Sequence, residues 1–498
     1  MNKIKLNSAS LSIIPILLFI PILIQLSNNF HSGGKALFYD FILSSLWPKI
    51  NIEIINTLFL RLNETIFIAL ISWFLSISLG IIFGIFSSDI FYKFSKLPIF
   101  LKNTFIFFLT ILRSIHEIIW GLILLNLYGL DISTGIIAIT IPYTAINAKV
   151  ICEQLENINI NKIKSISQIG GNNFSSFFVI IWNPILKIIR NFGIYRFECA
   201  LRSTAVIGLF GIGGIGTSII LSFQNLSFRE LWTYLWSLAF IILATNRILK
   251  TLNLKDFHKK IKSYILIISP FYIIFLIFII LKFFIKSKAV LSFLIKNTLQ
   301  IDNNFISNQL LQHTTETIFI SLLATGIAIS LPPVLLFTFN NQFMIIVYRS
   351  FSFLFRLIPP PILLLILLIF NEPSVSLGAL TLGLCNAAIT FKLLKENNLK
   401  SNNYLALKTT GASKRLSWFF GTFIEQSKIY LTYCSYRADI IFRETALVGV
   451  IGSIGLGWQL NESLSSFSWE EVSIIVLIYS LIAIIGEITN GKIKTILK

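Results

Sequence analysis

Long apolar runs separated by short polar segments are the dominant pattern along this chain. The run from Ile66 to Phe86, for example, carries no formal charge and is long enough to cross about 30 Å of hydrocarbon as a helix. Such runs predict membrane-spanning helices. In the first half of the chain they lie near residues 9–26, 62–86, 98–127, 132–153, 193–222 and 231–247. In the second half they lie near residues 264–281, 314–338, 351–370, 376–394, 434–457 and 471–486.

The second half of the sequence repeats the first. The motif Glu-Thr-Ile-Phe-Ile occurs at 64–68 and again at 316–320, and the segment 195–216 aligns without gaps to 436–457. A basic segment, Arg247 to Lys262, lies between the two copies. Similarity that keeps its register over this length indicates an internal duplication.

The duplication and the spans together predict the architecture. An even number of spans in each copy leaves both copies in the same orientation in the membrane. We therefore expect an all-α polytopic membrane protein with about twelve transmembrane helices in two parallel six-helix repeats. The first domain is placed at residues 1–260, with a cytoplasmic loop at about 155–190, and the second at 261–498, with the matching loop at about 396–430.

Composition and charge agree with a membrane protein. The chain is 55% hydrophobic and 13% charged, with a mean hydropathy of +0.80, which no soluble domain resembles. A net charge of +19 would suggest nucleic acid in a soluble protein, but here Lys and Arg cluster between spans and indicate topology instead. In the first half they favour the start of the chain and residues 87–97, 149–190 and 247–262, so we expect these loops and both termini to face the cytoplasm. The first apolar run lacks a small-residue cleavage site and is predicted to be an anchor.

Cysteines and histidines show no pattern of a disulfide or metal site. Cys152, Cys199, Cys385 and Cys434 fall in predicted spans or cytoplasmic segments, and none forms a Cys-x-x-Cys pair. The four histidines are scattered without a ligand spacing. We therefore predict neither a disulfide framework nor a metal centre.

Each predicted cytoplasmic loop reads as a short helix, a glycine-containing turn and a second amphipathic helix. In the second copy, Ala406 is followed by the turn residues Gly411, Ala412 and Ser413. Here the sequence resembles the membrane subunits of bacterial ATP-binding-cassette (ABC) importers, whose cytoplasmic loop carries a Glu-Ala-Ala motif followed by a glycine. In that family the loop docks on the ATPase and transmits nucleotide-driven closure to the spans. An amphipathic helix that only lies at the membrane surface is the alternative.

The first copy departs from this pattern. It keeps Gly171, but Ser167 and Asn172 replace small apolar residues. The resemblance implies the type I ABC importer permease fold, two copies of a cytoplasmic ABC ATPase, and a periplasmic solute-binding protein as partners. Coupling to the ATPase is assigned, by that resemblance, to Gly171, Asn172, Ala406, Gly411, Ala412 and Ser413.

A second resemblance involves the glycine-rich segments Arg202–Gly216 and Arg443–Gly457. Their openings, Arg-Ser-Thr-Ala-Val-Ile-Gly and Arg-Glu-Thr-Ala-Leu-Val-Gly, look like the phosphonate-type branch of the same permeases. Close glycines in a membrane segment allow tight helix approach or a broken helix at a solute pathway. Helix packing alone stays open as the alternative.

The glycine spacing also fits a dinucleotide fingerprint, at Gly211, Gly213 and Gly216. The context excludes it, because no soluble strand and helix flank the segment and the second copy has Ile454 in place of the middle glycine. The chain also lacks the phosphate-binding pattern Gly-x4-Gly-Lys-Ser/Thr. We therefore expect no cofactor and no enzymatic activity in this chain, with ATP and Mg bound by a separate ATPase.

Ionisable residues at membrane depth are costly and mark candidate functional positions. Arg113 is matched by Arg356, whereas Pro359 and Pro360 replace His116 and Glu117. A second pair of arginines, Arg202 and Arg443, has carboxylates nearby. Arginines suit a phosphorus oxyanion because each can offer two parallel donors, while pairing with the carboxylates or reaching the interface is the alternative. The candidate pathway residues are Arg113, Arg356, Glu198, Arg202, Thr204, Gly208, Gly211, Gly214, Asp439, Arg443, Thr445, Gly449, Gly452 and Gly455.

These features favour the permease of an ABC importer for a small anionic solute, such as phosphonate, phosphite or a related phosphorus oxyanion. A fused ferric-iron or thiamine ABC importer permease is an alternative of similar length. A secondary transporter with two parallel halves would need a titratable carboxylate relay, for which only Glu117 is a candidate. A membrane enzyme is disfavoured, because no repeated acid/base pair, nucleophile with a base, or metal cluster is found.

Overall fold

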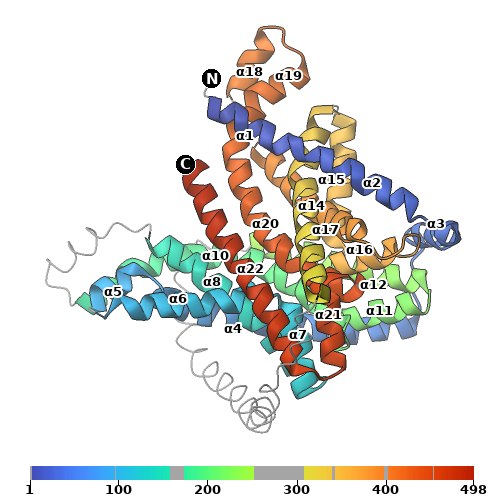
Figure 1. The fold of residues 1–498 in the computed structure, drawn as a ribbon, viewed down its shortest axis with the longest axis horizontal. Helices are drawn as coiled ribbons and strands as arrows, with labels where there is room; N and C mark the ends of the chain where they lie inside the picture. Colours follow the sequence, from blue (N-terminus) through green and yellow to red (C-terminus); the bar gives the residue numbers. More distant parts are fainter. Residues whose placement is uncertain are drawn as a thin grey trace. The chain divides into compact units, whose positions relative to one another are not determined.

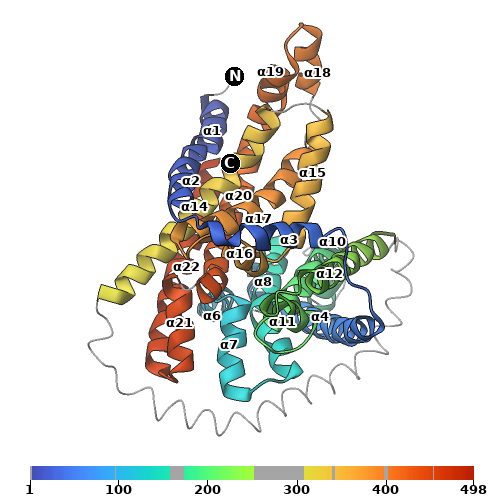
Figure 2. The same cartoon turned by 90° about the vertical axis from the view of Figure 1, so that its right-hand side faces the viewer.

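The computed structural model describes residues 3–95, 97–156, 173–251, 308–338, 342–397, 402–452 and 454–497. These residues are helical, and strand pairing among them is limited to an isolated bridge between Phe30 and Asn371. They form two compact units, one of residues 1–42 and 300–498 and one of residues 43–299. Figures 1 and 2 show the helices of both units.

The unit of residues 43–299 is built around two long helices packed side by side. Its helices are α4 (Ile52–Phe86), α5 (Asp89–Ser95), α6 (Ile99–Ser114), α7 (Glu117–Tyr128), α8 (Ile132–Glu156), α10 (Asn173–Gly208), α11 (Ile215–Gln224) and α12 (Phe228–Thr251). Helix α4 packs most extensively against α8, and α10 packs against both. A Cβ built on Gly84 would lie 2.8 Å from the Cβ of Ile151, so this glycine is what lets α4 and α8 approach so closely.

The unit of residues 1–42 and 300–498 holds the remaining described helices. They are α1 (Lys3–Ile13), η1 (Ile14–Leu18), α2 (Phe19–Asn28), η2 (Ser32–Gly34), α3 (Lys35–Ser44, which continues into the other unit), α14 (Asn308–Thr338), α15 (Gln342–Leu357), α16 (Pro360–Leu367), α17 (Val375–Asn397), α18 (Asn402–Thr409), α19 (Lys414–Trp418), η4 (Phe419–Phe423), α20 (Ile424–Gly452), α21 (Gly455–Ser465) and α22 (Trp469–Leu497). Helix α14 packs on α17, where a Cβ on Gly383 would lie 2.8 Å from the Cβ of Ile327. Figures 1 and 2 both place α18 and α19 at one end of this unit and α21 at the other.

The N-terminal helices pack on helices of the second sequence copy. Helix α1 lies against α14 and α20, where the hydroxyls of Ser8 and Ser427 share a hydrogen bond and Ala9 joins the buried cluster around Phe423. The backbone N–H of His31 donates to the carbonyl of Phe370 at 3.0 Å. The sequence assigned this first span to the domain at 1–260. The boundary predicted near residue 260 lies outside the described residues, and the domain division stays a prediction.

Six helices of the described residues are long and apolar enough to cross a membrane, or nine if each of three bent helix pairs counts as one span. The six lie at Ser8–Asn28, Ile52–Phe86, Ile132–Glu156, Gln309–Thr338, Val375–Leu394 and Trp469–Lys492. The chain is therefore an all-α, multi-pass membrane protein. The predicted span near 264–281 lies outside the described residues, and the total of about twelve stays a prediction.

Four predicted spans are broken rather than continuous. The runs near 193–222 and 434–457 break at glycines, between α10 and α11 and between α20 and α21, and two others bend sharply. The run near 98–127 forms α6 and α7, which meet at an angle of 84°, and the run near 351–370 forms α15 and α16, which meet at 101°. In the first, the ring Nδ1 of His116 accepts from the N–H of Ile118, 3.3 Å away, and so caps the new helix. In the second, Pro359 precedes a helix that begins with proline, and proline cannot continue an existing helix. A hydropathy pattern does not detect such bends, because both arms are apolar.

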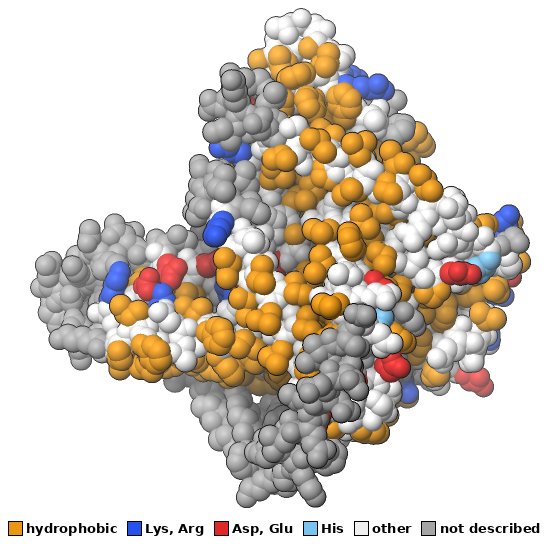
Figure 3. Space-filling model, viewed as in Figure 1, with side chains coloured by type: hydrophobic (Ala, Val, Ile, Leu, Met, Phe, Trp, Pro, Cys, Tyr) orange, Lys and Arg blue, Asp and Glu red, His pale blue; other side chains and the backbone are white. Residues whose placement is uncertain are grey.

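Apolar side chains cover much of the exposed surface of the described helices. Phe59, Phe240 and Leu477 expose 67%, 73% and 59% of their surface. Figure 3 shows orange apolar side chains spread over the visible face, with few charged ones between them. Exposed apolar surface on this scale is expected where lipid tails are the solvent.

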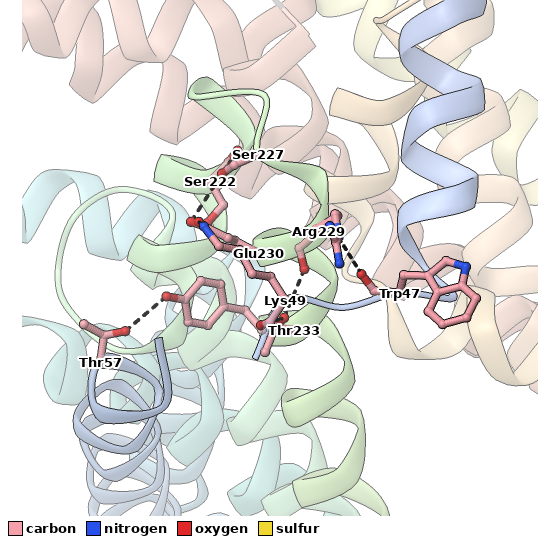
Figure 4. A network of polar contacts seen from close by, with 9 residues as sticks. Trp47, Lys49, Thr57, Ser222, Ser227, Arg229, Glu230 and Thr233 are labelled. Carbon is pink, nitrogen blue, oxygen red and sulfur yellow. Dashed lines mark hydrogen bonds and ion pairs between the residues drawn. The ribbon is translucent and has the colours of Figure 1, made fainter. Parts of the chain in front are cut away.

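The segment that precedes α4 is fixed to α12 by polar contacts (Figure 4). Arg229 Nε donates to the carbonyl of Trp47 at 2.9 Å, and the hydroxyl of Thr233 donates to the carbonyl of Lys49 at 2.8 Å. Lys49 Nζ also pairs with Glu230 at 2.7 Å. Because this segment is not helical, its carbonyls need such partners, and the contacts set where α4 begins relative to α12.

Replacing Gly84 by Leu should destabilise the unit of residues 43–299, because the added side chain would meet Ile151 where a Cβ is already too close. Overpacking of this kind costs about 1–3 kcal/mol. The melting temperature of the detergent-purified protein should therefore fall. Gly486→Leu is the control, since nothing lies within 4 Å of a Cβ at Gly486. Equal melting temperatures for the two variants would contradict the packing assigned to α4 and α8.

Candidate functional site

A glycine-built break separates α10 from α11. Helix α10 ends at Gly208 and α11 begins at Ile215, and between them Gly211, Gly213 and Gly214 have φ values of 87°, 109° and 81°. Residues with a Cβ rarely adopt these angles, whereas glycine does so at little cost. The two arms also approach closely, because a Cβ on Gly208 would lie 2.7 Å from the carbonyl oxygen of Gly213. The break therefore depends on glycine for both its angles and its space.

Two side chains of α4 cap the helix that begins after this break. The carboxylate of Glu64 accepts from the N–H of Gly214 at 2.9 Å, and the hydroxyl of Thr65 accepts from the N–H of Ile215 at 2.8 Å. Arg61 pairs with Glu64 at 3.0 Å. The first N–H groups of a helix have no partner within the helix, and a negative charge there is stabilised by the helix dipole. Glu64 and Thr65 thus satisfy the exposed backbone end of α11.

The other unit holds the same contacts at the paired positions. The carboxylate of Glu316 accepts from the N–H of Gly455 at 3.0 Å, and the hydroxyl of Thr317 accepts from the N–H of Leu456 at 2.9 Å. Gly455 has a φ of 69°. The Nδ1 of His313 lies 3.0 Å from the carboxylate of Glu316. His313 thus takes the place that Arg61 has beside Glu64.

Sequence reasoning noted the two parts of this site without joining them. The Glu-Thr-Ile-Phe-Ile motif served only to detect the repeat, and Glu64, Thr65, Glu316 and Thr317 were not among the candidate site residues. A signal was present, since a glutamate is kept at the same point of an apolar run in both copies. In the structure, the glutamate and threonine of the motif accept hydrogen bonds from the N–H groups at the glycine break.

The other glycine candidates allow close backbone approach. A Cβ on Gly449 would lie 2.8 Å from the Cα of Gly457, and one on Gly452 would lie 3.2 Å from a methyl of Leu364. These contacts occur within one unit, between α20 and its neighbours. A contact of these glycines with a solute stays a prediction.

The arginines before each break pair with carboxylates one turn earlier. Arg202 hydrogen-bonds Glu198 on α10, and Arg443 hydrogen-bonds Asp439 on α20. The side chains of Arg202 and Glu198 expose 22% and 16% of their surface, and those of Arg443 and Asp439 expose 12% and 10%. Neutralised in this way, the four side chains can remain at a half-buried site. Whether these arginines also bind solute stays a prediction.

The remaining candidates are two arginines at helix ends and two threonines within helices. Arg113 is buried in the last turn of α6, where its Nη2 donates to the hydroxyl of Thr110 at 3.0 Å, and Arg356 is half-buried in the last turn of α15. A cation in the last turn of a helix is favoured by the helix dipole. The hydroxyls of Thr204 and Thr445 donate to carbonyls of their own helices, at 2.8 Å and 2.6 Å.

The predicted helical hairpin is present in the second loop. Helices α18 and α19 flank a turn in which Gly411 has a φ of 81° and nothing lies within 4 Å of its Cβ position. Ser413 caps α19 by accepting from the N–H of Leu416. Ala406 and Leu405 are exposed, and Ala412 is half-buried. The helix-turn-helix prediction is therefore confirmed for this copy. In the first copy, Gly171 and Asn172 lie outside the described residues.

These features define the class of protein: a multi-pass, all-α membrane protein whose long helices break at glycines capped from a neighbouring helix. No known family profile and no solved structure matches the chain. Among curated proteins, it is similar over part of its length to permease proteins of transport systems for phosphonate, phosphite and phosphate. Those relatives are named as transport permeases.

Three relatives illustrate the similarity. The chain is 26% identical to the cryptic phosphonate transport system permease of Escherichia coli over 94 residues, which cover 19% of this chain and 77% of that protein. It is 24% identical to the phosphite transport system permease of Stutzerimonas stutzeri over 122 residues, covering 24% of this chain and 44% of that protein. It is 22% identical to the phosphate-import permease of Mycolicibacterium smegmatis over 118 residues, covering 24% and 22%. The match thus spans less than half the length of two of them.

Replacing Thr65 or Thr317 by Val should lower the melting temperature, because the N–H of Ile215 or Leu456 would lose its acceptor. An unsatisfied buried N–H costs about 1–3 kcal/mol. Thr104→Val is the matched control, since its exposed hydroxyl bonds only a carbonyl of its own helix. If all three variants melted together, the capping contacts would not stabilise the breaks.

Proposed function

We propose that this chain is the permease subunit of an ABC importer that moves a small phosphorus oxyanion, such as phosphonate or phosphite, into the cytoplasm. The observation that carries the proposal is the partial similarity to permeases named for phosphonate, phosphite and phosphate transport. The exposed hairpin of α18 and α19 adds support, because it has the form of a docking element. The protein would lie in a bacterial inner membrane with both termini in the cytoplasm.

The chain would act with three partner proteins. Two copies of a cytoplasmic ABC ATPase would dock at the loops near 155–190 and 396–430 and would bind ATP and Mg, because this chain has no phosphate-binding loop. A periplasmic binding protein would deliver the solute. Two domains fused in one chain would take the place of a dimer and alternate between outward-open and inward-open states.

The solute pathway is proposed to include the segments around the two glycine breaks. Arg202 and Arg443 are placed just before them and already bind carboxylates. Like a carboxylate, a phosphorus oxyanion can accept two parallel N–H bonds from a guanidinium, so it could replace Glu198 or Asp439 as the partner. Such a site would hold the anion weakly, which suits passage.

Reconstitution tests the proposed function. Proteoliposomes that contain this chain, its ATPase and its binding protein should take up radiolabelled phosphonate, phosphite or phosphate only when ATP is present. Uptake of ferric iron or thiamine instead would assign the solute to the alternatives raised by the sequence. Uptake that needs no ATPase would overturn the proposal in favour of a secondary transporter.

Replacing Gly411 by Val should uncouple transport. Valine at a φ of 81° is strained by about 1–3 kcal/mol, but the open space around this turn leaves no clash, so insertion should be normal. ATP-driven uptake should fall, while the ATPase activity of the assembled complex persists. Gly491→Val, also in open space, is the control. Unchanged uptake in Gly411→Val would count against a coupling role for α18 and α19.

Replacing Arg202 and Arg443 together by Gln should reduce uptake of an anionic solute, because two cations would be lost from the proposed pathway. Arg229→Gln is a control for loss of an arginine, since its side chain bonds the carbonyl of Trp47 instead of a carboxylate. The measurement is the initial rate at several solute concentrations. Normal rates in the double variant would restrict both arginines to a structural role.

A further inference from the structure

A buried arginine lies on the helix before each glycine break. Arg196 on α10 is 7% exposed, and Arg437 on α20 is 4% exposed. The gapless alignment of 195–216 with 436–457 pairs these two residues. A cation inside a membrane protein is costly unless polar groups and a negative charge compensate it. Each unit must therefore supply that compensation near its arginine.

In the unit of residues 43–299, a chain of polar contacts runs from Arg196 to a carboxylate. The guanidinium lies over the ring of Tyr143, 4.7 Å from its centroid. The Tyr143 hydroxyl lies 2.8 Å from the hydroxyl of Ser203, which donates to the carboxylate of Glu117 at 2.7 Å. Tyr143 belongs to α8, Ser203 to α10, and Glu117 is the first residue of α7. His116 also lies 3.4 Å from that carboxylate.

In the unit of residues 1–42 and 300–498, one amide replaces the two hydroxyls. Arg437 donates to the Oδ1 of Asn386 on α17, and the Nδ2 of Asn386 donates to the carboxylate of Glu444 at 2.8 Å. Asn386 is 1% exposed. Arg437 and Glu444 are both on α20, two turns apart. The cation and the carboxylate are thus joined through a single bridging residue.

The carboxylates of the two networks occupy different positions of the repeat. The register pairs Tyr143 with Asn386 and Ser203 with Glu444, whereas the position of Glu117 is taken by Pro360. By sequence alone the second copy has lost this carboxylate. In the structure, α20 supplies one in its place. We propose that Glu117 and Glu444 are equivalent positioning residues, each of which completes a charge-compensated network that fixes the rotation of the helix before the glycine break.

The rotation matters because a neighbouring face of the same helix carries the candidate pathway residues. Arg196 and Ser203 are two turns apart on the face of α10 toward α8, while the Glu198–Arg202 pair lies roughly 130° around the helix. A network that holds one face of α10 in place therefore also fixes the direction in which the Glu198–Arg202 pair points. The same relation holds for α20, where Asp439 and Arg443 form the pair. This role of the second face is the part of the inference that depends on the proposed function.

The test moves the carboxylate in the first network to the position it has in the second. Glu117→Gln alone should lower the melting temperature, because the network around the buried Arg196 loses its carboxylate. Tyr143→Asn and Ser203→Glu, added to Glu117→Gln, recreate the Asn386–Glu444 arrangement and should restore much of the loss. The matched control is Tyr143→Asn with Glu117→Gln, which contains no carboxylate at either position and should not recover.

A second arm keeps the inference testable if the triple variant folds poorly. Arg196→Met in the Glu117→Gln background removes the cation that this carboxylate helps to compensate, so the double variant should lose less stability than the sum of the two single variants. The same cycle with Arg437→Met and Glu444→Gln should also show a loss of stability smaller than the sum of the two single losses. Additive losses in both cycles, or a triple variant no more stable than its control, would overturn the proposal.

The rotation of α10 is measured separately, by thiol labelling. In a chain whose native cysteines are replaced, Arg202→Cys is labelled with a membrane-impermeant thiosulfonate reagent. Glu117→Gln should change this labelling rate several-fold, whereas Glu230→Gln, on α12, should leave it unchanged. Equal rates with and without Glu117 would reject the positioning role. If labelling and stability change as expected but uptake is unaffected by replacing Arg202 and Arg443, the pathway role is wrong and the network assignment stands.

Discussion

The capping of a broken helix by side chains of a neighbouring helix is the contact on which each unit depends. In a membrane, a helix that stops and restarts leaves backbone N–H groups that lipid cannot satisfy. Glu64 and Thr65 satisfy those of α11, and Glu316 and Thr317 satisfy those of α21. Without these acceptors the breaks would be too costly to persist. With them, α4 is joined to the start of α11 and α14 to the start of α21, so that the break has a defined geometry.

The breaks in turn explain the use of glycine. Gly214 and Gly455 have φ values of 81° and 69°, and a Cβ on either would lie less than 3 Å from the hydroxyl of the capping threonine. A side chain at these positions would therefore strain the backbone and displace the cap. The glycines therefore allow the break, and the Glu-Thr pairs cap the helix that begins after it. This is why both occur in each copy of the sequence.

Charge inside the helices follows the same rule of local compensation. Arg202 and Arg443 are paired with a carboxylate one turn away, and Arg196 and Arg437 reach carboxylates through Tyr143 or Asn386. Pairing with a carboxylate, directly or through a bridging side chain, allows charged side chains to remain inside the helical units without being exposed to lipid. Cations held in place in this way are what the proposed transport of an anion would require.

The sequence by itself determined the helical character of the chain, the duplication and the paired positions of the glycines and arginines. These follow from local composition, since an apolar run in a bilayer must be helical to satisfy its own backbone. The form of the loop near 396–430 was also predictable, because Gly411 and Ser413 are local turn and cap signals. Only the tertiary structure decided the angles at which α6–α7 and α15–α16 meet, which side chains cap the glycine breaks, and that Glu444 does in one unit what Glu117 does in the other. Those features depend on contacts between segments more than a hundred residues apart in several cases, such as the 150 residues between Glu64 and Gly214, and local composition carries no record of them.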